Sequence, residues 1–144
     1  MKHKVEIRCP NLNELEALLE LTLQMGYQVN SEQLSARLKS ILQNDDHILL
    51  IAITGDEVVG FIHAFQSLRL TSESFIEICG LAVKDTARGR GTGSMLVEAI
   101  EANLKPGQNI RVRCNIIRKK AHRFYTKLGY TCLKDQKVFE KMRE

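Results

Sequence analysis

The chain has no tryptophan, no C-x-x-C pair and no long apolar run. It therefore offers no row of aromatic side chains, interleaved with bases, on which nucleobases could stack. The longest apolar stretch, Ile48 to Ile53, is far shorter than the ~20 residues that cross a bilayer. The first ten residues also have no apolar core of a signal peptide. We expect a cytoplasmic protein with neither a membrane nor a nucleic acid as partner.

Cysteine is present but not in a metal-binding or redox pattern. The four cysteines are Cys9, Cys79, Cys114 and Cys132. Their spacing argues against a zinc site, and in a reducing compartment we expect four free thiols, several of them buried. Nothing in the sequence around Cys79 resembles the base that would activate a nucleophile. No metal is expected.

The 144 residues predict one domain spanning 1–144, and its charge is unevenly distributed. Residues 105–144 hold twelve Lys or Arg and three acids, whereas residues 1–104 hold nine bases and fourteen acids. A basic region can bind nucleic acid, an acidic partner or a phosphate-rich ligand. For the run Arg118 to Lys120 alone, a solvated surface is the simpler interpretation.

Hydrophobic periodicity predicts a mixed α/β fold. Strands are expected at 5–8, 47–53, 58–65, 74–83, 110–114, 130–133 and 137–142. Helices are expected from Asn11 to a stop at Gly26, from Asn30 or Ser31 onward, at 94–104 and at 118–128. In the first helix the predicted apolar stripe comprises Leu12, Leu15, Leu18, Leu19 and Leu23. Helices and strands in this order make a central sheet with helices covering it.

A glycine-rich loop between the strand predicted at 74–83 and the helix predicted at 94–104 gives the strongest indication of function. It reads Arg88-Gly-Arg-Gly-Thr-Gly93. Three glycines let main-chain amides turn toward one point, and the N-terminus of the following helix adds unpaired N–H groups and positive potential. Such a loop suits a phosphate. It lacks the lysine of a Walker loop, and its G-x-G-x-G spacing is not the dinucleotide fingerprint.

The loop resembles the R/Q-x-x-G-x-G/A signature of the GNAT acyltransferase superfamily, which cradles the pyrophosphate of acetyl-CoA. The preceding strand, Glu77-Ile-Cys-Gly-Leu-Ala-Val83, fits the same pattern. A second block, from Asn115-Ile-Ile-Arg118 through Ala121 and Phe124-Tyr125 to Gly129-Tyr130, is similar to the family's N-x-x-R-x-x-A-x-x-F-Y-x-x-x-G-F/Y motif. The two motifs occur in family order and cover most of the chain.

This resemblance implies a central, largely antiparallel sheet with a parallel pair splayed at the cofactor site and helices on both faces. It also implies acetyl-CoA as acyl donor. The cofactor-binding residues that it implies are Leu81, Ala82, Val83, Arg88, Gly89, Arg90, Gly91, Thr92, Gly93, Ser94 and Asn115. One main-chain N–H of the strand should face the thioester carbonyl and stabilise charge that builds on its oxygen.

Two residues are the implied catalysts. Tyr125 resembles the family's general acid, which protonates the departing sulfur; it also falls on an apolar helix stripe, so a core position is the alternative. Glu77 is the candidate base, because an amine of pKa near 10.4 is almost fully protonated at neutral pH. Glu77 could instead only orient a cationic substrate. His63, on the adjacent strand, is the rival base, and a water chain is a further one.

The predicted function is transfer of an acetyl group from acetyl-CoA to a primary amine, which attacks the thioester directly. A catalytically silent acyl-CoA sensor of the same fold is the alternative. The resemblance places Tyr27, between the first two helices, at the acceptor site. A polyamine, an amino-sugar, a small metabolite amine and a protein amine all remain open as acceptors, and so does a homodimer.

Overall fold

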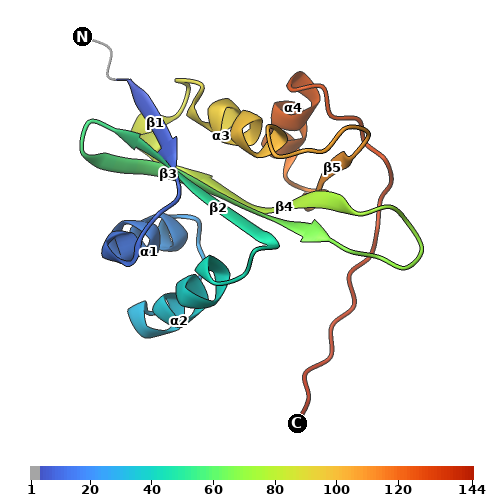
Figure 1. Ribbon diagram of the computed structural model, residues 1–144, viewed down its shortest axis with the longest axis horizontal. Coiled ribbons are helices and arrows are strands. Elements are labelled where there is room, and N and C mark those ends of the chain that lie inside the picture. Colours follow the sequence, from blue (N-terminus) through green and yellow to red (C-terminus); the bar gives the residue numbers. More distant parts are fainter. Residues whose placement is uncertain (1–3) are drawn as a thin grey trace. The chain divides into compact units, whose positions relative to one another are not determined.

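A computed structural model describes residues 4–144 (Figure 1). The chain forms two compact units, one ending at Val112 and one from Arg113 to Glu144, which are described separately. The first unit contains β1 (Val5–Arg8), a 3-10 helix η1 (Leu12–Glu14), α1 (Leu15–Gln24), α2 (Ser31–Leu42), β2 (His47–Thr54), β3 (Glu57–Ser67), β4 (Phe75–Val83), a 3-10 helix η2 (Asp85–Ala87), α3 (Thr92–Glu101) and β5 (Asn109–Val112). The second unit contains α4 (Lys119–Lys127).

The five strands form one sheet in the order β1-β2-β3-β4-β5. The first four strands are antiparallel to their neighbours, and β5 runs parallel to β4. Helices α1 and α2 cover one face of this sheet and α3 covers the other (Figure 1). The predicted fold class, a mixed α/β fold with a largely antiparallel sheet and one parallel pair, is confirmed.

The predicted start signals of the first two helical segments are confirmed. Asn11 and Glu14 form a capping box, in which the Asn11 side chain accepts from Asn13 N–H and the Glu14 carboxylate accepts from Asn11 N–H. Asn30 and Gln33 form a second capping box at the start of α2. These boxes satisfy amides that a helix N-terminus leaves unpaired.

The apolar stripe predicted for the first helix is only partly correct. Leu18 and Leu21 are its buried residues, whereas Leu12 and Leu23 are each 49% exposed. The chain begins this segment as a 3-10 turn, which has three residues per turn instead of 3.6. Leu12 lies in this turn, outside the α-helix, and Leu23 follows Leu18 by five residues, which places it on a different face of α1 from Leu18 and Leu21. Leu18 then packs with Leu38 of α2 and with the leucine and isoleucines of β2 in one core cluster.

Gly60 permits the close approach of β3, β4 and α3. A Cβ at this position would lie 2.8 Å from the main-chain oxygen of Ala82 and 3.3 Å from a methyl of Leu96. The Ala82 oxygen belongs to the main chain and the Leu96 side chain is fully buried in the core, so neither neighbour can move aside freely. We expect Gly60→Ala to lower the free energy of unfolding by about 1–3 kcal/mol, the range for overpacking a core. Denaturant unfolding measures this, with Gly80→Ala as the matched control because its Cβ would meet only ordinary contacts at 3.6 Å or more.

Two predictions about element boundaries need correction. Helix α3 begins at Thr92 instead of Ser94 and ends at Glu101 instead of Leu104. The two strands predicted at 130–133 and 137–142 are wrong, because the described chain beyond Lys127 forms neither a helix nor a strand. Val138 and Phe139, in the second of these segments, are about nine-tenths exposed. Alternating hydrophobicity belongs to one segment, whereas a strand exists only where a second strand pairs with it.

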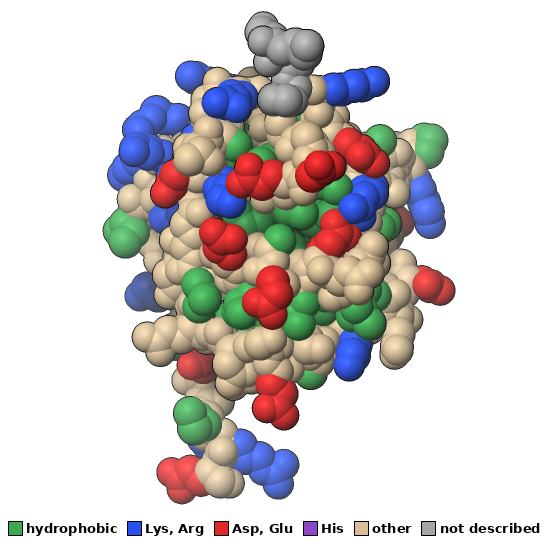
Figure 2. Space-filling model, turned by 90° about the vertical axis from the view of Figure 1, so that its left-hand side faces the viewer, with side chains coloured by type: hydrophobic (Ala, Val, Ile, Leu, Met, Phe, Trp, Pro, Cys, Tyr) green, Lys and Arg blue, Asp and Glu red, His purple; other side chains and the backbone are tan. Residues whose placement is uncertain are grey.

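At the end of the first unit that carries the β2–β3 turn, acidic side chains lie among apolar ones (Figure 2). There the Lys84 ammonium lies 2.6 Å from the Glu57 carboxylate of β3 and 3.8 Å from that of Glu20 on α1.

All four cysteines are free thiols as expected, but none belongs to the buried core, contrary to the expectation of several buried ones. Within residues 4–144, no helix combines the length and the apolar character that a membrane span needs.

Candidate functional site

The glycine-rich loop leads into α3, whose N-terminus has no side-chain cap. Gly89 and Gly91 both have φ +79°, a left-handed conformation that favours glycine. Gly91 is the N-cap of α3, where no side chain caps the first turn and no acidic residue lies in it. This contrasts with the capping boxes that Asn11 and Asn30 form in the same unit. The amides of Thr92, Gly93 and Ser94 precede the first helical hydrogen bond, which Met95 N–H donates to Gly91 O. They can therefore bind an anion.

Arg88 braces the loop in addition to supplying charge. Its Nε donates to the main-chain oxygen of Val83 at 3.3 Å, and its Nη1 lies 3.0 Å from the Asp85 carboxylate. Both Arg88 and Arg90 are exposed. The loop therefore presents two guanidinium groups beside the uncapped amides. The Asp85 carboxylate partly neutralises the charge of Arg88.

Strand β4 leaves half of its length unpaired on the side of β5. The β4–β5 pairing ends at Ile78 and Val112, whereas β4 continues to Val83. A strand directs alternate main-chain groups to its two sides. Within the described chain, the segment 79–83 therefore presents N–H and C=O groups to an edge that no strand covers. Leu81, Ala82 and Val83, the predicted pantetheine-binding residues, lie on this segment.

A β-bulge marks the point where this unpaired segment begins. The register of β3 and β4 shifts between His63 and Ala64, which pair with Gly80 and Ile78, so that Cys79 is the extra residue. The Cys79 thiol donates to His63 O at 3.5 Å. Partial burial of the sulfur, with a contribution from the nearby Glu77 carboxylate, raises the pKa of this thiol to about 11. Cys79 is therefore a thiol, not a nucleophilic thiolate, at neutral pH.

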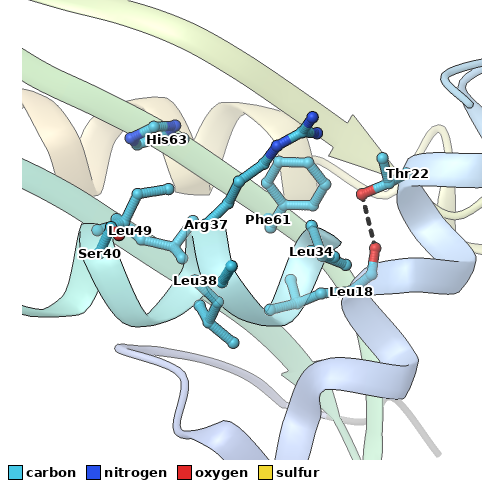
Figure 3. Close-up of a pocket in the computed structure, with 11 residues that line it drawn as sticks. Leu18, Thr22, Leu34, Arg37, Leu38, Ser40, Leu49, Phe61 and His63 are labelled. Carbon is cyan, nitrogen blue, oxygen red and sulfur yellow. Dashed lines mark hydrogen bonds between the residues drawn. The ribbon is translucent and has the colours of Figure 1, made fainter. Parts of the chain in front are cut away.

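A cavity of about 540 Å³ lies between α1, α2 and the sheet (Figure 3). Leu49 of β2 and Phe61 and His63 of β3 form its floor. Its walls come from two helices: Leu18 and Thr22 of α1, and Leu34, Ala36, Arg37, Leu38, Ser40 and Ile41 of α2. Tyr27, predicted to contact the acceptor, is not among the lining residues and is 60% exposed.

Cross-strand register places Glu77 on the same sheet face as this cavity. Glu77 is opposite Phe65 on β3 and opposite Arg111 on β5. Directly opposed residues, and every second residue along a strand, share a face. Phe65 and His63 are two positions apart, so Glu77 and His63 face the same side. The structure thus brings both candidate bases to the cavity side of the sheet.

His63 forms a pair with His47 of β2. His47 Nδ1 and His63 Nε2 are 2.8 Å apart and share a hydrogen bond, and the His47 ring also stacks on Phe65 at 5.5 Å. Burial, and secondarily the charge of His47, lowers the pKa of His63. His63 is therefore a neutral imidazole at pH 7.

The remaining predicted site residues belong to the second unit. Tyr125 is buried in α4, with ring centroids 5.0 Å from Phe124 and 5.5 Å from Tyr130. Burial, reinforced by Cys114, raises the pKa of the Tyr125 hydroxyl to about 12. Asn115 has a structural bond as well: its side-chain oxygen accepts from Ile117 N–H at 3.1 Å in the turn before α4.

Sequence reasoning missed three features of the site: Arg37, the His47–His63 pair and the bulge at Cys79. A signal for Arg37 was present, since it falls three residues after Leu34 and four before Ile41, on the apolar stripe of α2. The histidine pair depends on strand register and left no local signal. Among residues 4–144, no group of three or more His, Cys, Asp or Glu side chains could hold a metal ion.

Solved structures with the same fold include several acetyltransferases. An aminoglycoside N-acetyltransferase in complex with CoA has a TM-score of 0.86 and 20% identity, covering 99% of this chain and 97% of that one. Glucosamine-6-phosphate N-acetyltransferase from Arabidopsis thaliana has a TM-score of 0.81 and 18% identity, covering 95% and 98%. A transcriptional regulator from Bacillus halodurans C-125 has a TM-score of 0.82 and 24% identity, covering 96% and 100%. The fold is thus one that acetyltransferases use.

The sequence itself identifies the family. Residues 12–130 match the sequence model of the Acetyltransferase (GNAT) family. Among curated proteins, no sequence matches the chain. The matched range includes both motifs, from the first helical segment to Tyr130. The chain therefore belongs to the GNAT acetyltransferase family.

Proposed function

We propose that the protein transfers the acetyl group of acetyl-CoA to a primary amine in the cytoplasm, without an acyl-enzyme intermediate. The observation that carries this proposal is the uncapped N-terminus of α3 beside the unpaired half of β4. The first suits a pyrophosphate and the second suits the amide-bearing pantetheine arm, which can accept and donate main-chain hydrogen bonds as a strand does. A solved structure of similar fold that contains CoA supports the assignment.

In the proposed reaction the amine nitrogen attacks the thioester carbonyl. The C–N bond forms, negative charge builds on the oxygen, and a β4 main-chain N–H near the bulge stabilises that charge. The Glu77 carboxylate takes the amine proton directly or through water. As the C–S bond breaks, the Tyr125 hydroxyl gives its proton to the sulfur, so that CoA leaves as a thiol. The raised pKa of Cys79 supports direct attack over transfer through a cysteine.

The loop's role is tested by Gly91→Glu. This change puts a carboxylate beside the first-turn amides of α3, where phosphate is expected to bind. We expect acetyl-CoA affinity to fall at least tenfold, which corresponds to ~1.4 kcal/mol or more. Titration calorimetry measures it. In the parent protein, acetyl-CoA at about a hundred times its dissociation constant should stabilise the fold by about 2.7 kcal/mol, far more than ATP or NAD.

Two control variants separate charge from backbone strain. Gly91→Gln has the same left-handed backbone and nearly the same shape, but no charge. Gly107→Glu places the same side chain at φ +78° in a different turn, with no atom within 4 Å of its Cβ. We expect the Gly107 variant to bind acetyl-CoA normally. If folded Gly91→Glu also binds it normally, the loop does not hold the cofactor.

A further inference from the structure

The cavity between α1, α2 and the sheet has mostly apolar walls and one permanently charged side chain. Most of its lining side chains are aliphatic or aromatic, and Thr22 and Ser40 add hydroxyls. Thr22 already donates its hydroxyl to Leu18 O at 2.7 Å, so this hydroxyl offers little to a ligand (Figure 3). Arg37 supplies the only full positive charge, and no Asp or Glu is among the described lining residues.

Arg37 is also uncommitted within the protein. It is an exposed residue of α2 whose side chain lines the cavity (Figure 3). Within residues 4–144 its guanidinium has no ion pair or hydrogen bond, whereas Arg8, Arg69 and Arg88 each have at least one. A guanidinium presents paired N–H donors that match a carboxylate.

The cavity lies on the side of the sheet where acetyl transfer is proposed. His63, on its floor, is opposite Gly80, the residue after the bulge at Cys79. Glu77 faces the same side two pairs further along β3, opposite Phe65. The lining itself includes no residue of β4, but through His63 the cavity reaches the strand that pairs with the β4 segment proposed to carry the thioester.

We propose that this cavity binds the body of the acceptor, and that the acceptor is an amine with an apolar aliphatic or aromatic group and one carboxylate that pairs with Arg37. This inference rests on the proposed acetyl transfer and names its substrate class. One cation matches one carboxylate, whereas the second charge of a phosphate would have no partner there. Polyamines and aminoglycosides fit badly, because they would place several positive charges beside Arg37 and face no carboxylate in the lining.

Binding is tested first, without acetyl transfer. The probe is 3-phenylpropionate, which has the apolar group and the carboxylate but no amine, and its neutral partner is 3-phenylpropanamide. Calorimetry should show that the acid binds more tightly than the amide. Arg37→Gln should weaken the acid at least tenfold and leave the amide within about twofold, because only the acid uses the guanidinium. Arg37→Lys should restore part of the loss.

Lys39→Gln is the matched control, since Lys39 is an exposed cation on the same helix outside the cavity lining. It should bind both probes like the parent protein. If the acid and the amide bind equally, or if Arg37→Gln does not distinguish them, the carboxylate assignment is overturned.

Turnover is tested second, by following thiol release from acetyl-CoA. L-phenylalanine should be a better acceptor than phenethylamine, which lacks the carboxylate, and both should exceed spermidine and kanamycin in kcat/KM. Arg37→Gln should abolish the preference for phenylalanine over phenethylamine. Turnover with spermidine or kanamycin alone would overturn this inference while leaving acetyl transfer intact. Arg37-dependent binding of the acid with no turnover of any amine would instead overturn the proposed enzyme and leave the cavity assignment standing.

Discussion

Glu77→Gln should reduce kcat/KM for an alkyl amine by about 10²- to 10⁴-fold near pH 7, the range of general-base catalysis. An amine of pKa near 10.4 is protonated at that pH, and exposing its lone pair costs ~4.6 kcal/mol. A carboxylate that accepts the proton during attack recovers part of this cost, and an amide cannot. The deficit should shrink as the pH rises toward about 10, because the amine then loses its proton unaided. Profiles of kcat/KM against pH measure both effects.

Glu98→Gln is the matched control, because Glu98 is an exposed acid on α3. It should show the parent profile. If Glu77→Gln keeps the parent profile, Glu77 is not the base. The next candidate is then His63, because its lowered pKa keeps the imidazole unprotonated at pH 7 and its hydrogen bond to His47 provides a partner for a proton relay.

Tyr125→Phe should lower kcat about ten- to a thousandfold and leave acetyl-CoA affinity nearly unchanged. The ring contacts with Phe124 and Tyr130 survive in phenylalanine, so only the proton donor is lost. Because the pKa of Tyr125 is raised to about 12, its hydroxyl holds the proton at every lower pH. The acid form is therefore present throughout the assay range, and Tyr125 should cause no alkaline decline in rate below about pH 10. Single-turnover rates and calorimetry separate chemistry from binding.

The leaving group gives a second test of Tyr125. An acyl donor whose thiol has a lower pKa needs less protonation as it departs, so the deficit of Tyr125→Phe should shrink with that donor. Tyr130→Phe, which removes a hydroxyl from the adjacent ring, serves as the control and should leave this dependence unchanged. Full activity of Tyr125→Phe with ordinary acetyl-CoA would assign Tyr125 to packing alone.

Features set by neighbouring residues were predictable from the sequence. The caps at Asn11 and Asn30 depend on side chains three residues apart, and both are where the sequence predicts them. The glycine loop and its following helix likewise depend on local conformation, although the left-handed N-cap at Gly91 moved the start of α3 to Thr92.

Features that depend on pairing between distant segments were not predictable. His47 and His63 are sixteen residues apart and meet only because β2 and β3 pair in one register. The bulge at Cys79 follows from how β4 fits β3, and alternation along β4 alone does not show it. The two strands predicted in the C-terminal segment were wrong for the opposite reason. The alternating pattern is present there, but no strand in the described chain pairs with it.

The uncapped start of α3 has a consequence for anyone who engineers this protein for heat resistance. An acidic residue in the first turn of a helix typically stabilises it by 0.3–1 kcal/mol, and a good cap adds about 1 kcal/mol. A stability-guided search would therefore choose Asp or Glu near Thr92, Gly93 or Ser94. Those substitutions would place a carboxylate at the amides where the phosphates of the acyl donor are proposed to bind. The same first-turn amides of α3 would serve either a stabilising cap or the proposed acyl donor. A screen by melting temperature alone would therefore select variants that no longer bind the donor.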